Sequence, residues 1–115
     1  MGTQTMNDQE TVRQVREWFE GTRQVAGPIL PDGWFGRPFD NTWFIVDVYI
    51  LDDVMTMQFV HDCIIFISKP RLVRADQAGL TLWGSGGHVV MSYGNPALPS
   101  RNYTFGNGEV TFLPC

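Results

Sequence analysis

The chain has 115 residues, a formal net charge of −4 and a pI of about 4.9, so it is expected to form one domain with a buried core. Its eight Lys and Arg residues are scattered, which argues against a nucleic-acid partner, because binding to a phosphate backbone needs clustered basic side chains. The composition is 43% hydrophobic and only 17% charged, so we expect apolar surface patches for a partner or a second subunit.

The first eight residues are polar, and no run of residues reaches the length of a membrane span. We therefore expect a cytoplasmic protein with no signal peptide and no membrane partner. In that compartment Cys63 and Cys115 are expected to be free thiols, Cys63 as a small buried hydrophobe. A disulfide between the two is the alternative.

Residues 1–7 are expected to be disordered, and residues 8–20 are expected to form the one helix of the chain. Asn7 is a suitable N-cap, and Glu10 three residues later completes a capping box. Gly21 is a natural helix stop. One face of this helix is apolar, because hydrophobic residues recur at helical spacing: Val12, Val15, Trp18 and Phe19.

Residues 22–41 are predicted to be a long loop, because prolines and glycines interrupt every possible helix or strand. The interrupting residues are Pro28, Pro31, Gly33, Gly36 and Pro38. A loop of this length in a small domain is either functional or packed by its own side chains.

The remainder of the chain alternates short apolar runs with turns, which predicts about eight strands. The expected strands span residues 43–51, 54–60, 63–68, 72–75, 80–83, 88–93, 102–105 and 109–113. Short connections favour an antiparallel meander. The predicted fold is α+β and mainly antiparallel β: residues 8–115 form a single domain in which the helix packs on a meander over residues 43–113, as a roll, barrel or two-layer sandwich.

Residues 30–41 read Leu-Pro-Asp-Gly-Trp-Phe-Gly-Arg-Pro-Phe-Asp-Asn. This stretch resembles the Gly-Trp-Phe-Gly-Arg-Pro-Tyr-Asp-Asn motif of a family of small uncharacterised bacterial proteins, in which a β meander follows the motif. Phe39 stands where that motif has Tyr. Residues 88–96 are similar to a later segment of the same family, and such proteins resemble the products of mobile, integron-type gene cassettes. The resemblance implies a fold and no reaction.

Two places in the chain are candidate ligand sites. In the long loop, Arg37 could fix the loop by pairing with a neighbouring aspartate, or could bind an anion at the rim of an aromatic pocket. In the first long strand, Asp47 stands alone among apolar residues, so its carboxylate must be paired, exposed on a cavity wall, or raised in pKa. The candidate ligand-binding residues are Trp34, Phe35, Arg37, Asp40, Trp43 and Asp47.

Other polar clusters predict little chemistry. The turns at residues 52–53 and 61–62 should lie at opposite ends of the strand between them, so His61 lacks nearby metal ligands, and we predict no metal and no cofactor. Residues 84–88 (Gly-Ser-Gly-Gly-His) lack the Lys-Ser/Thr of a phosphate loop and are predicted to be a hairpin turn.

The sequence therefore favours a binding or interaction module over an enzyme. We expect it to form a homo-oligomer and to bind a small apolar ligand or a protein partner. One alternative is a hydrolase or isomerase that uses Asp47, His61 or Asp40 as acid or base. Another is an immunity- or antitoxin-like protein whose acidic charge suits a basic partner.

Overall fold

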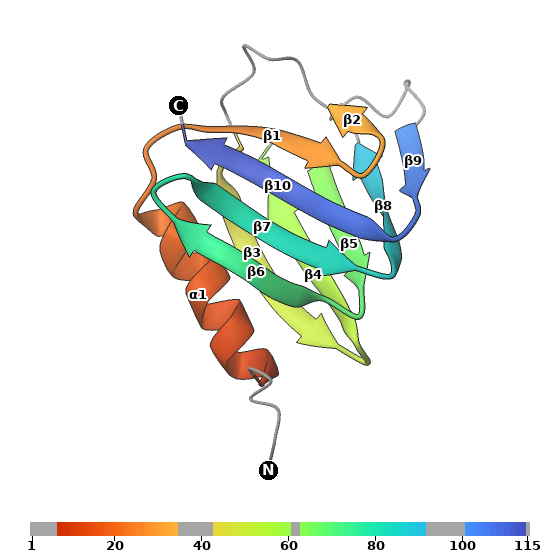
Figure 1. Cartoon of the computed structure of the whole chain (residues 1–115), viewed down its shortest axis with the longest axis horizontal. Helices are drawn as coiled ribbons and strands as arrows, with labels where there is room; N and C mark the ends of the chain where they lie inside the picture. Colours follow the sequence, from red (N-terminus) through yellow and green to blue (C-terminus); the bar gives the residue numbers. More distant parts are fainter. Residues whose placement is uncertain (1–6, 35–42, 61–62, 92–100, 115) are drawn as a thin grey trace.

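The structure, a computed structural model, describes residues 7–34, 43–60, 63–91 and 101–114 (Figure 1). Its first element is helix α1 (Asp8–Glu20), which confirms the predicted helix. The side-chain Oδ1 of Asn7 accepts a hydrogen bond from the backbone N–H of Glu10 at 2.8 Å, as expected of an N-cap. The apolar stripe of α1 is buried through Val15, Trp18 and Phe19, while its other face carries charged side chains.

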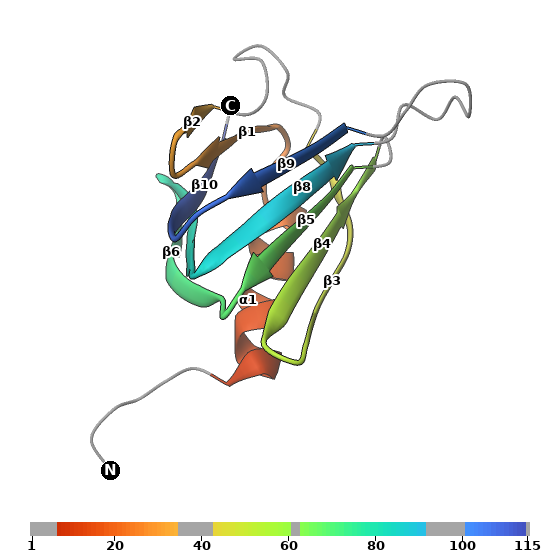
Figure 2. The ribbon, with the colours of Figure 1, turned by 90° about the vertical axis from the view of Figure 1, so that its right-hand side faces the viewer.

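Ten strands follow in the described part of the chain. They are β1 (Val25–Leu30), β2 (Gly33–Trp34), β3 (Ile45–Leu51), β4 (Val54–Phe59), β5 (Cys63–Ser68), β6 (Arg71–Asp76), β7 (Gly79–Gly84), β8 (Gly86–Met91), β9 (Arg101–Phe105) and β10 (Gly108–Pro114). They form two antiparallel five-stranded sheets. Sheet A has the order β2-β1-β10-β7-β6 and sheet B the order β3-β4-β5-β8-β9. The sheets pack face to face (Figures 1 and 2), which confirms a mainly antiparallel α+β fold.

The prediction of a loop over residues 22–41 is wrong for residues 25–30 and 33–34, which form β1 and β2. Pro28 suggested a break, because proline cannot donate to a sheet ladder. The structure accommodates it in an irregularity: the register of β1 against β10 shifts between Ala26 and Ile29, which frees Pro28 from pairing.

The simple meander is also wrong beyond β5. Strands β3, β4 and β5 pair consecutively, but β5 next pairs with β8, and the β6–β7 hairpin belongs to sheet A. The glycine segment 84–87 is therefore a crossing between sheets and not a hairpin. A Cβ on Gly84 would lie 2.4 Å from Cγ2 of Ile67, and one on Gly87 would lie 2.0 Å from the carbonyl oxygen of Phe66. Only glycine allows this close approach.

Helix α1 fills the open side between β3 and β6, which are edge strands of the two sheets (Figures 1 and 2). It bonds to both edges: Nη2 of Arg16 donates to the carbonyl of Val48 at 3.0 Å, and Nε1 of Trp18 donates to the carbonyl of Asp76 at 2.8 Å. Each edge also has a register shift, at Val46 in β3 and at Val73 in β6. Bulges and a covering helix both oppose pairing with another chain's strand.

Side chains fill the space between the sheets. Phe19 of α1, Phe59 of β4 and Phe112 of β10 meet with ring centroids 5.2 to 5.7 Å apart. Trp43 packs edge-on against Phe59 at 5.1 Å. Methionine, isoleucine, leucine and valine side chains complete this cluster: Met55, Met57, Ile65, Ile67, Leu80, Leu82, Val89 and Val110 are all fully buried. The core therefore joins the helix to both sheets.

Candidate functional site

The outer face of sheet B is the most distinctive surface of the molecule. Along its strands, residues directed into the core alternate with residues on the outer side, as in β3, where Val48 is buried and Tyr49 is exposed. The side chains on the outer face, hereafter the sheet-B face, are Asp47, Tyr49, Leu51, Val54, Thr56, Gln58, Ile64, Phe66, Ser68, His88, Val90, Asn102 and Thr104. Asp47 is the one formally charged side chain among them, with histidine neutral.

A row of side chains crosses the middle of the sheet-B face. It runs through all five strands in register as Tyr49, Thr56, Phe66, His88 and Thr104. The Phe66 ring and the His88 imidazole are stacked, with centroids 4.5 Å apart and planes inclined by 26°. Aromatic and β-branched residues in adjacent strands stabilise a sheet through such lateral contacts. The row contains no Asp, Glu, Lys or Arg, and Thr56 within it is only 6% exposed.

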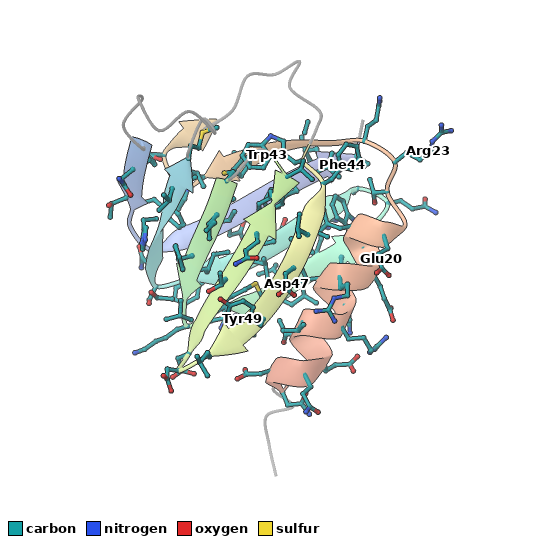
Figure 3. All side chains as sticks on the ribbon, turned by 180° about the vertical axis from the view of Figure 1, so that it is seen from behind. Glu20, Arg23, Trp43, Phe44, Asp47 and Tyr49 are labelled. Atoms are coloured by element: carbon teal, nitrogen blue, oxygen red, sulfur yellow. The ribbon has the colours of Figure 1, made fainter. Side chains whose placement is uncertain are left out.

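Exposed apolar side chains are concentrated in residues 44–51, and two of them, Tyr49 and Leu51, belong to the sheet-B face. The large exposed hydrophobic residues of the described chain are Phe44, Val46, Tyr49, Leu51, Val73 and Tyr103, and the first four lie within residues 44–51. Val46 and Leu51 are 63% and 66% exposed. Figure 3 looks onto the sheet-B face and shows α1 beside β3, with no described helix or strand in front of the sheet.

Asp47 lies at the rim of this face, exposed, and not on a cavity wall. Its Oδ1 lies 3.7 Å from Nη2 of Arg16 and accepts a hydrogen bond from the backbone N–H of Val48 at 2.9 Å. The sequence analysis considered pairing as one outcome, and the partner is Arg16. Both side chains are about half exposed, so solvent screens this ion pair and its contribution to stability is small.

The structure separates the candidate ligand-binding residues that it describes. Trp43 is buried in the aromatic core, whereas Asp47 lies on the outer surface, so the two do not line one pocket (Figure 3). The structure describes the backbone of Trp34, as part of β2, but not its side chain. Phe35, Arg37 and Asp40 lie outside the described residues.

The remaining candidate residues divide in the same way. His61, Asp62 and Cys115 lie outside the described residues. Cys63 is a buried free thiol, as expected, and burial raises its pKa to about 12. Among the described residues, no three His, Cys, Asp or Glu side chains cluster closely enough to hold a metal ion. In the same part of the chain, no helix has the length and hydropathy needed to cross a membrane.

A groove of about 520 Å³ lies at the C-terminal end of α1. Its lining residues are Glu17, Trp18, Gly21, Thr22, Arg23, Asp76, Gln77 and Pro114. Four of its polar side chains are already engaged: Glu17 pairs with Arg13 at 2.8 Å, Asp76 pairs with Arg74 at 3.2 Å, and the Trp18 indole N–H and the Thr22 hydroxyl each donate to a backbone carbonyl. Arg23 and Gln77 make no such contact with another described residue, so the groove leaves two polar side chains for a ligand.

The outer face of sheet A has the opposite character, because it is charged. Arg71 of β6, Trp83 of β7 and Glu109 of β10 form one row across it. The Arg71 guanidinium lies over the Trp83 ring, 5.1 Å from its centroid. No local sequence pattern indicates this pair, since residues 71 and 83 meet only through the register of β6 against β7.

Comparisons of this chain with protein-family models, with curated proteins and with solved structures gave no significant match. The resemblance of residues 30–41 to a bacterial family therefore stays a prediction.

Proposed function

We propose that this protein is a binding module that self-associates through the sheet-B face. The observation that carries the proposal is the unequal distribution of charge between the two sheets. The sheet-B face has one charged side chain at its rim, and apolar residues such as Tyr49 and Leu51 stand exposed on it. The outer face of sheet A carries Arg71, Arg74 and Glu109. An uncharged, partly aromatic patch is typical of the centre of a protein interface.

The edges of sheet B are poorer candidates than its face. A strand edge binds a partner by offering unpaired backbone groups in a regular row. In β3 the bulge at Val46 breaks that row, and Arg16 of α1 occupies the carbonyl of Val48. At β9 the hydroxyl of Tyr103 donates to the carboxylate of Asp32, which ties this edge to the turn between β1 and β2. Association through the face of the sheet does not need free backbone groups at either edge, so these features do not oppose it.

The size of the face suits a weak dimer. Five strands at about 4.8 Å spacing and about six residues at 3.3 Å rise give roughly 24 by 20 Å in projection. The accessible surface of such a face exceeds its projection, and a standard interface needs about 800 Å² from each partner. Two copies stacked through this face would form a sandwich with sheets about 10 Å apart. The projected area of roughly 480 Å² lies below the area of a standard interface, so a dimer through this face would belong to the weak, concentration-dependent class.

A small ligand inside the sheets has less support than self-association, because side chains from the helix and both sheets fill the core. Catalysis by Asp47 also has little support, since its carboxylate is exposed and paired with Arg16. An immunity- or antitoxin-like role would place a different protein on the same face. The oligomeric state of the purified chain distinguishes these possibilities.

Sedimentation equilibrium over a wide range of protein concentration tests the proposal. The wild-type mass is expected to rise from 13.0 kDa toward twice that value as concentration increases. Tyr49→Lys places a charge in the central row, and each side chain occurs twice in a two-fold interface. At roughly 1.4 kcal/mol for each copy, the dimer should dissociate about a hundredfold more readily.

Val73→Lys is the matched control, because Val73 is 49% exposed on sheet A and Tyr49 is 41% exposed on sheet B. The control should dimerise as the wild type does. A wild-type protein that stays monomeric at every concentration would refute self-association. Equal weakening by both substitutions would refute the assignment to the sheet-B face.

A further inference from the structure

We infer that Arg71 and Trp83, on the outer face of sheet A, form a docking point for an acidic segment of a partner protein. This site lies on the opposite side of the molecule from the sheet-B face, so the inference does not depend on self-association. It rests on the stacking geometry of the pair, on the unused hydrogen-bonding capacity of Arg71, and on the charges around it.

The stacking leaves the arginine able to bind a carboxylate. Arg71 and Trp83 are register partners in β6 and β7, and the guanidinium lies 5.1 Å from the centroid of the indole ring. A guanidinium over an indole ring keeps its N–H donors available to other groups, because the ring offers a π surface and no oxygen acceptor. Those donors match the two oxygens of a carboxylate in a paired, fork-like contact. The ring also holds the arginine in one place, which lowers the entropy lost on binding.

The donors of Arg71 are unused in the described part of the chain. Arg74, three residues later in β6, is engaged by Asp76, with its Nε 3.2 Å from a carboxylate oxygen. Arg71 has no such ion pair among the described residues. The nearest acid in its row is Glu109, which lies two strands away in β10. Trp83 of β7 lies between them, and no ion pair joins Glu109 to Arg71 in the described part of the chain.

The local charge favours an acidic partner although the whole chain is acidic. Three of the eight basic residues, Lys69, Arg71 and Arg74, lie within residues 69–74. A cluster of this size is too small to follow a nucleic-acid backbone, which takes many phosphate contacts. Because Asp76 already pairs with Arg74, we place a single carboxylate of a peptide segment on Arg71. Trp83, which is partly exposed, can contact an apolar residue beside that carboxylate.

An NMR titration of the full chain with a blocked peptide of alternating Glu and Leu tests the inference. The indole Nε1–H of Trp83 and the Nε–H of Arg71 should shift and saturate, with a dissociation constant in the millimolar range or tighter. The same peptide with Gln in place of Glu should cause no saturable shift. A third arm uses inorganic phosphate, which tests for a general anion site. Phosphate should bind more weakly, because it offers no apolar contact to Trp83.

Arg71→Gln should weaken binding of the Glu peptide at least tenfold, since it removes a charge-assisted contact of about 1.5 kcal/mol or more. Arg74→Gln is the matched control on the same strand and should change the affinity less than twofold. The inference is overturned if the Glu peptide causes no shift, or if the Gln peptide or phosphate binds equally well. It is also overturned if the Arg74 variant loses as much affinity as the Arg71 variant.

Discussion

The indole N–H of Trp43 allows a sharp test of the structure, because it is a buried donor without a partner. The side chain is 5% exposed and packs edge-on against Phe59. Its Nε1 is the one buried side-chain nitrogen or oxygen of the described residues that has no hydrogen-bond partner. A buried donor loses its hydrogen bonds to water on folding, and without a protein partner no new hydrogen bond compensates for that loss. Replacing Trp43 by Phe removes this donor and keeps an aromatic ring in the core.

Two opposing effects set the expected size of the change. A phenyl ring is smaller than an indole and leaves a cavity of roughly 40 Å³, which costs about 1 kcal/mol at about 24 cal/mol per Å³. Removing the unpaired N–H recovers about 1–3 kcal/mol of desolvation. The free energy of unfolding of Trp43→Phe is therefore expected to equal that of the wild type or to exceed it by up to about 2 kcal/mol.

Trp18→Phe provides the matched control, because Trp18 is also an indole in the aromatic cluster and is 9% exposed. Its Nε1, unlike that of Trp43, donates to the carbonyl of Asp76 at 2.8 Å. The substitution creates a similar cavity and also loses a hydrogen bond with a net worth of about 1 kcal/mol. The control should therefore lose about 2 kcal/mol of stability, and the two variants should differ by at least that amount.

Urea unfolding followed by far-UV circular dichroism, at one protein concentration, measures both variants without depending on tryptophan fluorescence. The midpoint of Trp43→Phe should stay at or above that of the wild type, with an unchanged dependence on urea concentration. Equal destabilisation of the two variants would refute the reasoning, because it would show that the Trp43 N–H has a partner in solution.

Two further predictions concern glycine packing and the buried thiol. Gly87→Ala should destabilise the fold by about 3 kcal/mol or prevent folding, because its Cβ would lie 2.0 Å from the carbonyl oxygen of Phe66. Gly106→Ala, which meets nothing within 4 Å, should change the urea midpoint little. The thiol of Cys63, with its pKa raised to about 12, should resist Ellman's reagent at pH 8 in a Cys115→Ser background until the protein unfolds. The same shift predicts the sign of a pH effect: the stability contributed by this thiol is complete below its unfolded pKa of about 8.5 and is lost as the pH rises toward 12. The difference in unfolding free energy between wild type and the Cys63→Ala variant should therefore change between pH 7 and pH 10. The same difference at both pH values would contradict the predicted sign.

The parts of the fold that depend on local sequence were predictable. Helix α1 follows from an N-cap, an apolar stripe and a glycine stop, all within fifteen residues of one another, and its observed bounds match. Strand β4 follows from alternation of apolar and polar residues, and β5 from a short continuous apolar run. The sheet to which each strand belongs was not predictable, because β6 and β7 have the same local pattern whichever sheet they join. The crossing at Gly84 is decided by contact with Ile67, which is distant in sequence.

The sequence composition predicted that an apolar interaction surface exists, but it did not predict which residues form that surface. The high apolar content pointed to an exposed interaction patch, whereas the nearly continuous apolar run of β3 is typical of a strand covered on both faces. In the structure only one face of β3 is covered. Val48 on that face is buried in the core, whereas the opposite face is exposed. The outward residues Tyr49 and Leu51 made the strand look buried on both sides. Similarly, Asp47 stood out as a lone acid, but the partner that explains it, Arg16, comes from a helix whose docking position no local pattern gives.

The exposed apolar residues of β3 are the part of the structure that the monomer does not explain. Threonine at positions 49 and 51 would preserve strand propensity and would leave the inward residues Val48 and Ile50 in place. The packing of the monomer therefore does not require the outward Tyr49 and Leu51. Their exposure in water is instead a cost in solubility, which the burial of this face against a second copy would remove. The outer face of sheet A, in contrast, carries the charged residues Arg71, Arg74 and Glu109. The contrast between the two faces therefore favours association through sheet B.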